Sequence, residues 1–487
     1  MAACLALMVV AGAWSIGGQP ADASTAPGSN PIVAENAHPG TLSWQIPAPG
    51  YRIANDLGGQ IKGYASATSV NVGGRLDFLV SVNPAQPYRI AIYRLGWYRG
   101  AGGRLLLLTP FLPGIHQASC ASDLRTGLAQ CAWRPSYRLS VPRTWVSGLY
   151  VAVLSSMWRY QNYVPFTVRD DTGRQPLLVV QPVATYQAYN NYPRGTGKSL
   201  YDFNSAGGRT MSGGTRAVKV SFDRPYAADG SGGLFVYEHP LVRWLEASGY
   251  AVSYVTDVDL HARGTMSRRY RGIVFSGHSE YWTAPMRNTA EAARGAGVGL
   301  AFLGANDAYW QARLEPSRAR QPNRTLVCYR AAALDPVIDR RLVTVRWRDA
   351  PVRRPEQLLL GMEYSNMVRG SAPFVVVNAR SWIYAGTGLR DGQALPGLIG
   401  GEADRIDTSA GVPLALSRIL LGRSPYRTRQ GGRDIANALV YVAPSRASVF
   451  AAGTLSWNLA LGAPGSIDPR VQRVTHNVLN RMLGLPA

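Results

Sequence analysis

Lysine is nearly absent from this chain of 487 residues, since it occurs only at positions 62, 198 and 219 among 51 basic residues. The formal net charge of +22 is therefore carried by arginine, and the arginines are scattered along the chain with no dense basic tract. Modules that bind nucleic acid usually concentrate basic residues on one element beside stacking aromatic side chains. The composition therefore predicts that nucleic acid is not a partner.

Histidine and cysteine are also scarce, with six and four copies in the whole chain and no Cys-x-x-Cys motif. A zinc site takes three or four ligands drawn mostly from these residues, so their scarcity argues against zinc. Cys120 and Cys131 flank a polar loop of ten residues, and we expect them to form a disulfide in an oxidising compartment. Cys328 is then unpaired and is predicted to be a buried small hydrophobic residue.

Charged residues make up only 16% of the chain and hydrophobic residues 46%, a composition that excludes a disordered chain. The apolar stretch 2–13 is too short for a stable membrane span, and Ala21-Asp22-Ala23 fits a signal-peptidase site. Residues 1–23 are therefore predicted to be a signal peptide and residues 24–50 a flexible N-terminus. The chain is expected to be exported, whether periplasmic, cell-surface or extracellular.

Two regions with different patterns follow. Residues 51–172 contain short β-branched and aromatic runs separated by Gly, Pro and Asn, which predicts a β-sandwich of immunoglobulin or jelly-roll kind. Residues 176–487 alternate strand and helix patterns, which predicts a doubly wound, mostly parallel α/β domain of Rossmann, flavodoxin or glutamine-amidotransferase type. Helices are expected at 240–248, 284–295 and 469–483, and extra strands after residue 320 include 342–347. The predicted fold class is thus α/β plus all-β.

The most informative segment runs from Arg271 to Trp282, where an apolar strand pattern ends in Ser-Gly and is followed by His278 and Glu280. In a parallel sheet the carboxyl ends of the strands share one edge, where such folds bind their ligands. A helix cap is the simpler explanation, but capping requires neither a histidine nor a tryptophan at these positions. Polar residues after other predicted strands would join this edge: Tyr186, Tyr189, Asn190, Asp257, Asp259, Asn306 and Asp307, with Glu402 and Asp404 from a later loop.

Nucleophilic catalysis is poorly supported at this edge. Ser279 follows a strand, but Tyr281 stands where a nucleophile elbow requires glycine, and no cysteine occupies a comparable strand end. Oxygen ligands remain, because phenolates with carboxylates suit ferric iron, whereas carboxylates alone suit calcium or magnesium. Tyrosines at strand ends are also common as packing residues, so the residues alone leave both the metal site and its metal open.

Several segments resemble the family of the large (beta) subunit of N,N-dimethylformamidase, namely residues 93–105, 186–192, 198–201, 220–226, 276–282 and 396–405. The similarity covers both predicted domains, roughly residues 50 to 485. The resemblance implies one ferric ion (Fe3+) bound by two tyrosinates and one glutamate. It also implies that hydroxide on that iron attacks the carbonyl of a small amide.

The same resemblance implies roles for single residues. Glu280 is the implied carboxylate ligand and Tyr189 one phenolate, while Tyr226 is preferred as the second, with Tyr237 and Tyr186 as competitors. His278 is implied as a catalytic hydrogen-bonding neighbour and Glu402 as a base or substrate-orienting group. Asn190 and Asn306 are implied as hydrogen-bond donors.

A second hypothesis stays open, in which the chain is an exported cell-surface protein that binds carbohydrate and whose α/β domain is not catalytic. The family enzyme works inside the cell with a small partner subunit, whereas export predicts a different setting here. The expected partner is a small-molecule amide, without nucleic acid or a stable membrane span, and the sequence leaves a homo-oligomer open.

Overall fold

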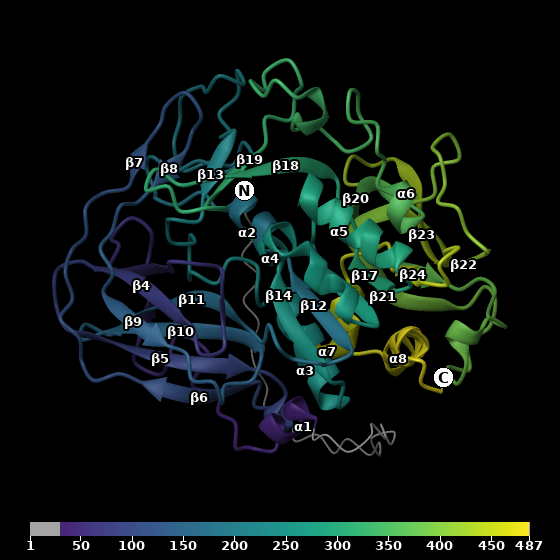
Figure 1. Cartoon of the computed structure of the whole chain (residues 1–487), viewed down its shortest axis with the longest axis horizontal. Helices are drawn as coiled ribbons and strands as arrows, with labels where there is room; N and C mark the ends of the chain where they lie inside the picture. Colours follow the sequence, from purple (N-terminus) through teal and green to yellow (C-terminus); the bar gives the residue numbers. More distant parts are fainter. Residues whose placement is uncertain (1–29, 487) are drawn as a thin grey trace.

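The computed structural model describes residues 30–486 and shows a mixed α/β protein built from several sheets with helices around them (Figure 1). The mixed α/β class predicted from the sequence is confirmed at this level. The predicted signal peptide, residues 1–23, lies outside the described residues. Among residues 30–486, no helix combines the length and the apolarity that crossing a membrane requires.

Two sheets form the N-terminal part, on the left of Figure 1. One has the strand order β1-β11-β10-β5-β6, with β3 beside β11, and the other has the order β2-β4-β9. Phe78, Ile92 and Leu154 are fully buried in one apolar cluster between them, so the sheets share a core. The named sandwich types stay predictions. The strands are β1 (Arg52–Ile53), β2 (Ile61–Ala65), β3 (Ser69–Asn71), β4 (Arg75–Val82), β5 (Tyr88–Leu95), β6 (Gly103–Leu108), β9 (Tyr137–Ser140), β10 (Gly148–Ser156) and β11 (Tyr160–Arg169).

Strand β10 contributes to two cores at once. Ala152 and Leu154 belong to the cluster between the two N-terminal sheets, whereas Val151 and Val153 belong to a cluster shared with the C-terminal part of the chain. Successive side chains of a strand point to opposite faces, so β10 is buried on both. The six-stranded sheet therefore joins the two parts of the molecule through its side chains.

Residues 30–50 differ from the flexible segment predicted from composition. The chain forms α1 (Pro31–Asn36), and the Asn36 side chain donates a hydrogen bond to Glu246 Oε2 over 2.7 Å. Glu246 also pairs with Arg94 at 2.8 Å, and neither of these charged side chains is exposed. This segment is thus held by buried polar contacts to both parts of the molecule, which composition does not reveal.

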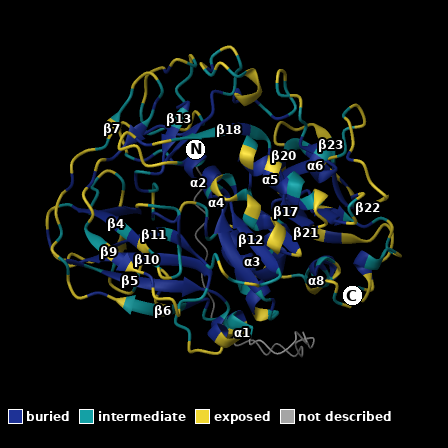
Figure 2. Cartoon of the chain, viewed as in Figure 1, coloured by how far each residue is buried: buried dark blue, intermediate teal, exposed yellow. Residues whose placement is uncertain are grey.

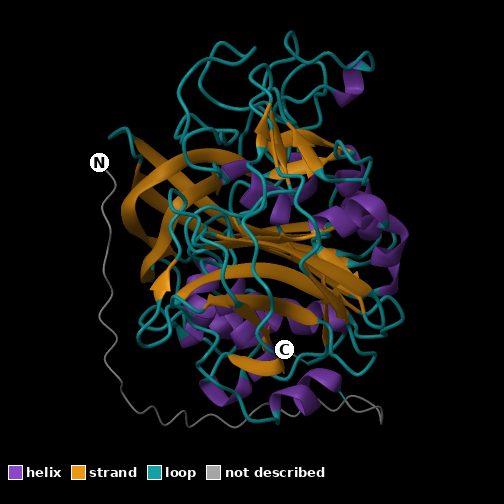
Figure 3. Cartoon of the chain, turned by 90° about the vertical axis from the view of Figure 1, so that its left-hand side faces the viewer, coloured by secondary structure: helices purple, strands orange, loops and turns teal. Residues whose placement is uncertain are grey.

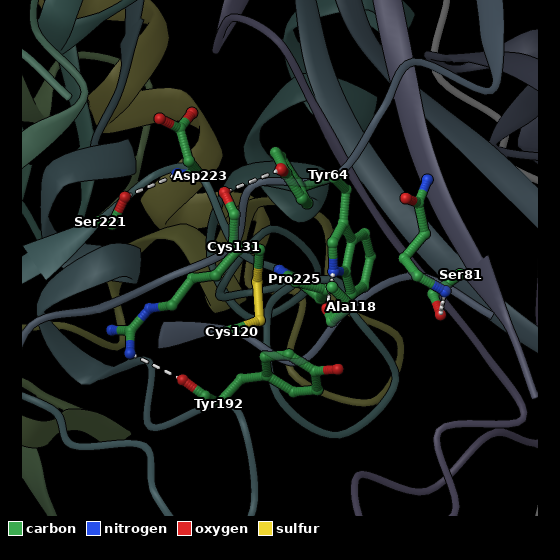
Figure 4. Close-up of a disulfide and its surroundings, with 12 residues drawn as sticks. Tyr64, Ser81, Ala118, Cys120, Cys131, Tyr192, Ser221, Asp223 and Pro225 are labelled. Atoms are coloured by element: carbon green, nitrogen blue, oxygen red, sulfur yellow. Dashed lines mark hydrogen bonds between the residues drawn. A yellow bond between two sulfur atoms is a disulfide. The ribbon is translucent and has the colours of Figure 1, made fainter. Parts of the chain in front are cut away.

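The predicted disulfide between Cys120 and Cys131 is present (Figure 4). The Tyr64 hydroxyl donates a hydrogen bond to the Cys131 carbonyl over 3.3 Å, and the Cys131 N–H donates to the Asp223 carbonyl over 2.8 Å. The bridge therefore ties its loop both to the small N-terminal sheet and to the chain beyond β11. Cys328 is free and buried, as predicted. The loop carries β7 (Ala121–Ser122) and β8 (Ala129–Gln130).

A seven-stranded sheet forms the centre of the C-terminal part, in the order β14-β12-β15-β17-β24-β23-β22. The first five strands are parallel, and β23 and β22 extend the sheet in antiparallel pairs. The mostly parallel pairing agrees with the sequence pattern, while the named Rossmann-like types stay predictions. The strands are β12 (Leu177–Gln181), β14 (Val252–Thr256), β15 (Gly272–Gly277), β17 (Gly299–Gly304), β22 (Ser417–Arg427), β23 (Arg433–Val442) and β24 (Ser448–Ala451).

Helices cover both faces of this sheet, which Figure 2 shows as a buried layer. Leu178 and Val180 join a cluster with residues of α4 and α5, whereas Leu177 and Val179 join another with residues of α3, α7 and α8. Figure 1 shows these two helix groups on opposite sides of the strands. The bounds of α5 and α8 are those predicted. The helices are α3 (Glu238–Ala247), α4 (Asp257–Ala262), α5 (Ala284–Gly295), α6 (Gln357–Leu360), α7 (Trp457–Gly462) and α8 (Pro469–Leu483).

Two smaller sheets complete the C-terminal part, and Figure 3 shows the sheets from the side as stacked layers. The prediction of a strand at 342–347 is wrong, because this segment makes only an isolated bridge between Trp310 and Arg346. Two backbone hydrogen bonds flank that bridge, from the Gln311 N–H to the Val345 carbonyl over 2.8 Å and from the Trp347 N–H to the Tyr309 carbonyl over 3.0 Å, whereas the Val343 carbonyl accepts from the Gln311 side chain. The strands are β13 (Lys219–Ser221), β16 (Tyr281–Thr283), β18 (Trp310–Glu315) and β19 (Thr325–Val327) in one sheet, and β20 (Glu363–Val375) and β21 (Ala394–Arg405) in the other.

Candidate active site

Glu280 lies between the end of β15 and the start of β16, and its side chain is buried. Its backbone N–H donates to Thr185 Oγ1 over 3.0 Å, and its carbonyl accepts hydrogen bonds from the N–H groups of Tyr309 and Trp310, each at 3.0 Å. The peptide at Glu280 is thus fixed from both sides. The predicted strand end therefore presents this carboxylate in a defined position.

Two phenols converge on the Glu280 carboxylate. The Tyr201 hydroxyl lies 2.8 Å from Oε1 and 2.6 Å from Oε2, and the Tyr189 hydroxyl lies 3.2 Å from Oε2. The two rings are stacked with 4.2 Å between their centroids. Tyr189 ends α2 (Val183–Tyr189), and Tyr201 belongs to the loop that follows. Three hard oxygen donors therefore lie around one point.

The electrostatics of this cluster favour a cation. Burial raises the pKa of both phenols above its ordinary value, and the Glu280 carboxylate raises it further. Burial also raises the pKa of Glu280 itself. A positive ion between these groups would stabilise the ionised form of each one and so lower its pKa. Within residues 30–486, no group of three His, Cys, Asp or Glu side chains is arranged to hold a metal ion, so a metal ion at Glu280 would need the two phenols as ligands.

His278 lies between two carboxylates at the same edge. Its Nε2 is 3.0 Å from Glu402 Oε2 and 3.4 Å from Glu280 Oε2. Burial alone would lower the pKa of His278, but the charges of Glu402 and Glu280 outweigh it and raise the pKa to about 9. Burial would raise the pKa of Glu402, yet His278 lowers it overall. The two side chains therefore form a largely buried ion pair beside the phenols.

Asn306 fixes the other side of Glu402. Its Nδ2 donates to Glu402 Oε2 over 2.9 Å, and its backbone N–H donates to Asp404 Oδ1 over 2.8 Å. Its φ of 59° lies in the left-handed region, which asparagine tolerates better than most residues. The Asn306 Oδ1 and both carboxylate oxygens of Asp307 are buried without a hydrogen-bond partner in the described structure. These oxygen atoms are therefore available to accept hydrogen bonds from a bound molecule.

Two predicted site residues do not reach Glu280. Tyr226 packs edge-on against Tyr186, with 6.4 Å between ring centroids, and Tyr186 donates to Glu238. Asn190 is fully engaged near the end of α2, where its Nδ2 donates to the Gln187 side chain over 2.7 Å and to the Pro225 carbonyl over 3.0 Å. Its Oδ1 also accepts two backbone N–H groups. Asn190 thus shapes the loop and offers no free group to a substrate.

Tyr237 packs beside the end of β15 and lies near Glu402, since burial and then the Glu402 charge raise the pKa of its phenol to about 12. A Cβ added to Gly277 would lie 2.6 Å from the Tyr237 Cβ, so this tyrosine packs against the backbone there. The second phenol beside the Glu280 carboxylate is Tyr201, whereas the resemblance favoured Tyr226. Tyr201 ends the segment 198–201, one of those that carried the family resemblance, and that segment was the available signal.

Comparisons with known proteins agree with this resemblance. The family model described as "N,N-dimethylformamidase beta subunit-like, C-terminal" matches residues 89–472. The N,N-dimethylformamidase beta subunit of Alcaligenes sp. is 23% identical over an alignment length of 427, and the match covers 73% of this chain and 55% of that protein. The chain thus spans about half the length of this curated relative.

Similarity to solved structures is too weak to carry an argument. A Paenibacillus sp. cycloisomaltooligosaccharide glucanotransferase is 9% identical, with a TM-score of 0.18 over 52% of this chain and 44% of that one. A structure of PhoD is 9% identical, with a TM-score of 0.22 over 90% of this chain and 99% of that one. The family model, by contrast, matches well over half of the chain and includes every residue of the cluster around Glu280. The chain therefore belongs to the family of N,N-dimethylformamidase beta subunit-like C-terminal regions.

Proposed function

We propose that this chain is an amide hydrolase that holds one ferric ion with Tyr189, Tyr201 and Glu280. The observation that carries the proposal is the convergence of two partly buried phenols on one buried carboxylate. Phenolate and carboxylate oxygens are hard donors that suit ferric iron. Three such anions also balance the three positive charges of the ion, so the group as a whole is neutral and its desolvation costs less free energy.

A ferric ion at this position would supply Lewis acidity, polarising a carbonyl oxygen and lowering the pKa of water. The remaining steps belong to side chains of the protein. Glu402 is ionised beside His278 and is placed to accept a proton from an attacking water molecule. His278, in its protonated form, is placed to donate a proton to the nitrogen that leaves when the C–N bond breaks.

The geometry also allows the proton to return. Glu402 Oε2 and His278 Nε2 are 3.0 Å apart, so once His278 has given its proton to the leaving nitrogen, the proton taken up by Glu402 can pass to the neutral imidazole and restore the starting pair. Asn306 donates to the same Glu402 oxygen and keeps it oriented, while its free Oδ1 can accept an N–H or O–H group. The pair thus serves as base and acid in one reaction cycle.

The substrate class is inferred from the family. The curated relative is named a beta subunit of N,N-dimethylformamidase, and we infer a small-molecule amide as the substrate here. Assembly with other subunits, including a homo-oligomer, and export through a signal peptide belong to the same proposal. A calcium or magnesium ion and a carbohydrate-binding role are the competing outcomes.

Elemental analysis and a visible spectrum of the purified protein test the proposal, together with hydrolysis assays on a panel of small amides. We expect about one iron per chain and a phenolate-to-iron absorption band. A colourless protein that contains calcium or magnesium and no iron would show that the proposed ferric ion is wrong and that one of these metals occupies the site. Metal-free protein that binds glycans and releases no amine from any amide would overturn it.

A further inference from the structure

Arg330 lies directly against one of the two phenols. Its guanidinium carbon is 4.2 Å from the centroid of the Tyr201 ring and 4.8 Å from the centroid of the Trp310 ring. The guanidinium also donates a hydrogen bond to the Tyr281 hydroxyl. Arg330 follows β19 by three residues, so it reaches this position from the four-stranded sheet.

The contacts of Arg330 are those of a clamped cation. Arginine stacks on aromatic faces through its planar guanidinium, and the ring quadrupole attracts its charge. The Nε atom of Arg330 is buried without a hydrogen-bond partner in the described structure. The position therefore depends on stacking between Tyr201 and Trp310 and on the single hydrogen bond to Tyr281.

The two phenols are unequal in this respect. Tyr201 has the Arg330 guanidinium over its ring, whereas no arginine or lysine lies over the ring of Tyr189 among residues 30–486. Tyr189 instead contacts Phe203 and His278 at ring-centroid distances of 5.9 and 5.6 Å. Tyr201 is also the phenol that lies within 2.8 Å of both Glu280 oxygens.

We propose that Arg330 is a positioning residue of the metal site, whose guanidinium holds the Tyr201 phenol on Glu280 and places a positive charge beside it. The inference rests on the proposed iron site. A positive charge near a phenolate lowers the energy of the electrons that the phenolate shares with a metal. Removing the charge should therefore move the absorption band to longer wavelength, because less energy is then needed to transfer an electron to the iron.

Two substitutions separate charge from shape. Arg330→Met removes both the charge and the planar stack, whereas Arg330→Lys keeps a charge that can still lie over the ring. Arg341→Met is the matched control, because the Arg341 side chain is 88% exposed and pairs only with the neighbouring Asp339. Trp310→Leu removes the other face of the clamp and leaves the arginine in place.

Iron affinity and the visible spectrum are the readouts. We expect Arg330→Met to bind iron roughly 10- to 100-fold more weakly, the range usual for outer-shell partners of metal ligands, and to shift the band to longer wavelength. Arg330→Lys should recover part of both effects, Trp310→Leu should weaken iron binding less than Arg330→Met, and Arg341→Met should match the wild type. Unchanged iron affinity and band position in Arg330→Met would overturn the inference while leaving the iron site standing.

Crystal structures of the iron-free wild type and Arg330→Met give a test that does not depend on iron. We expect the Tyr201 hydroxyl of the variant to move away from Glu280, and an unchanged contact would overturn the inference. If the wild type bound no iron, the proposed function would fail, and these crystal structures would still decide whether Arg330 positions Tyr201. If Arg330→Met does not fold, Arg330→Lys and Trp310→Leu carry the same comparison.

Discussion

The Tyr201 hydroxyl bridges both oxygens of the Glu280 carboxylate, at 2.8 and 2.6 Å. The two residues are 79 positions apart and come from different elements, a loop after α2 and the end of β15. Their contact means that neither position can be assigned from its own neighbourhood. It also makes Tyr201 the residue that most directly tests the metal site.

Tyr201→Phe should lose iron, because it removes one oxygen donor and keeps the ring stacked on Tyr189. We expect iron affinity to fall by more than about 100-fold, beyond the range for outer-shell changes. Iron content after dialysis and the visible band measure this. Tyr226→Phe is the matched control, since Tyr226 contacts Tyr186 and not Glu280; a Tyr226 variant that loses iron while Tyr201→Phe keeps it would reverse the assignment.

Glu402→Gln should keep iron and lose turnover, because the amide cannot accept a proton from water. General-base catalysis contributes roughly 10²- to 10⁴-fold, so kcat should fall within that range. Steady-state assays together with iron analysis of the same sample check it. A variant with normal kcat would remove Glu402 from the proposed proton transfer.

Asn190→Ala should destabilise the fold without acting on the chemistry. Its side chain makes hydrogen bonds to the Gln187 side chain, the Pro225 carbonyl and two backbone N–H groups. Buried groups that lose their hydrogen-bond partner cost about 1 to 3 kcal/mol of stability. Urea denaturation should show this loss, while kcat per folded, iron-loaded chain stays near the wild-type value. Asn191→Ala, whose side chain donates one hydrogen bond to the Phe203 carbonyl, should cost less. A collapse of kcat in stably folded Asn190→Ala would instead support the role implied by the resemblance, in which Asn190 donates a hydrogen bond during catalysis.

Removing the Cys120–Cys131 bridge should lower the free energy of unfolding. Two Cys→Ser substitutions open a loop with a sequence separation of 11, and loop-closure entropy predicts a loss of about 3 kcal/mol. Thermal or urea denaturation measures it, with reduced wild type as a parallel sample. Mass mapping that finds free thiols at both cysteines of the native protein would contradict the bridge.

Glu238 predicts a pH-dependent stability. Burial raises its pKa to about 8 from an ordinary value of 4.5, even though hydroxyl groups of Tyr186 and Ser276 donate to it. The pKa is higher in the folded state than in the unfolded chain. The stabilisation that protonated Glu238 adds to the free energy of unfolding is therefore fully present below about pH 4.5 and is lost as the pH rises to about 8. Glu238→Gln should flatten the fall in unfolding free energy over that window. Equal slopes for variant and wild type would show that Glu238 ionises freely in the folded protein.

The sequence predicted the parts of the fold that depend on local patterns. The helices 284–295 and 469–483 have an apolar face and clear end signals, and the strand before His278 is a compact apolar run, so each was found where the structure has it. The strand predicted at 342–347 failed because its apolar run is buried without extended pairing: Val343 to Val345 are all buried, and the segment makes only an isolated bridge to Trp310. Order in residues 30–50 was missed because it comes from buried polar contacts made by Asn36 over 200 positions away.

The site divides in the same way. Glu280 and His278 follow a strand directly, and their position can be argued from the chain alone. Tyr201 lies in a loop with no periodicity, and only long-range folding brings it to Glu280. Tyr226 ends a clear motif, but its motif turns the ring toward Tyr186. Motif strength and spatial position are thus independent for residues in long loops.

The two-faced burial of β10 has a consequence for how this protein can change over evolution. Val151 and Val153 face one core while Ala152 and Leu154 face another. A gene rearrangement that separated the N-terminal and C-terminal parts would therefore expose an apolar surface on each. Fusion of one part to an unrelated domain would require several simultaneous substitutions to make that apolar face polar. We therefore expect the two halves to be inherited together.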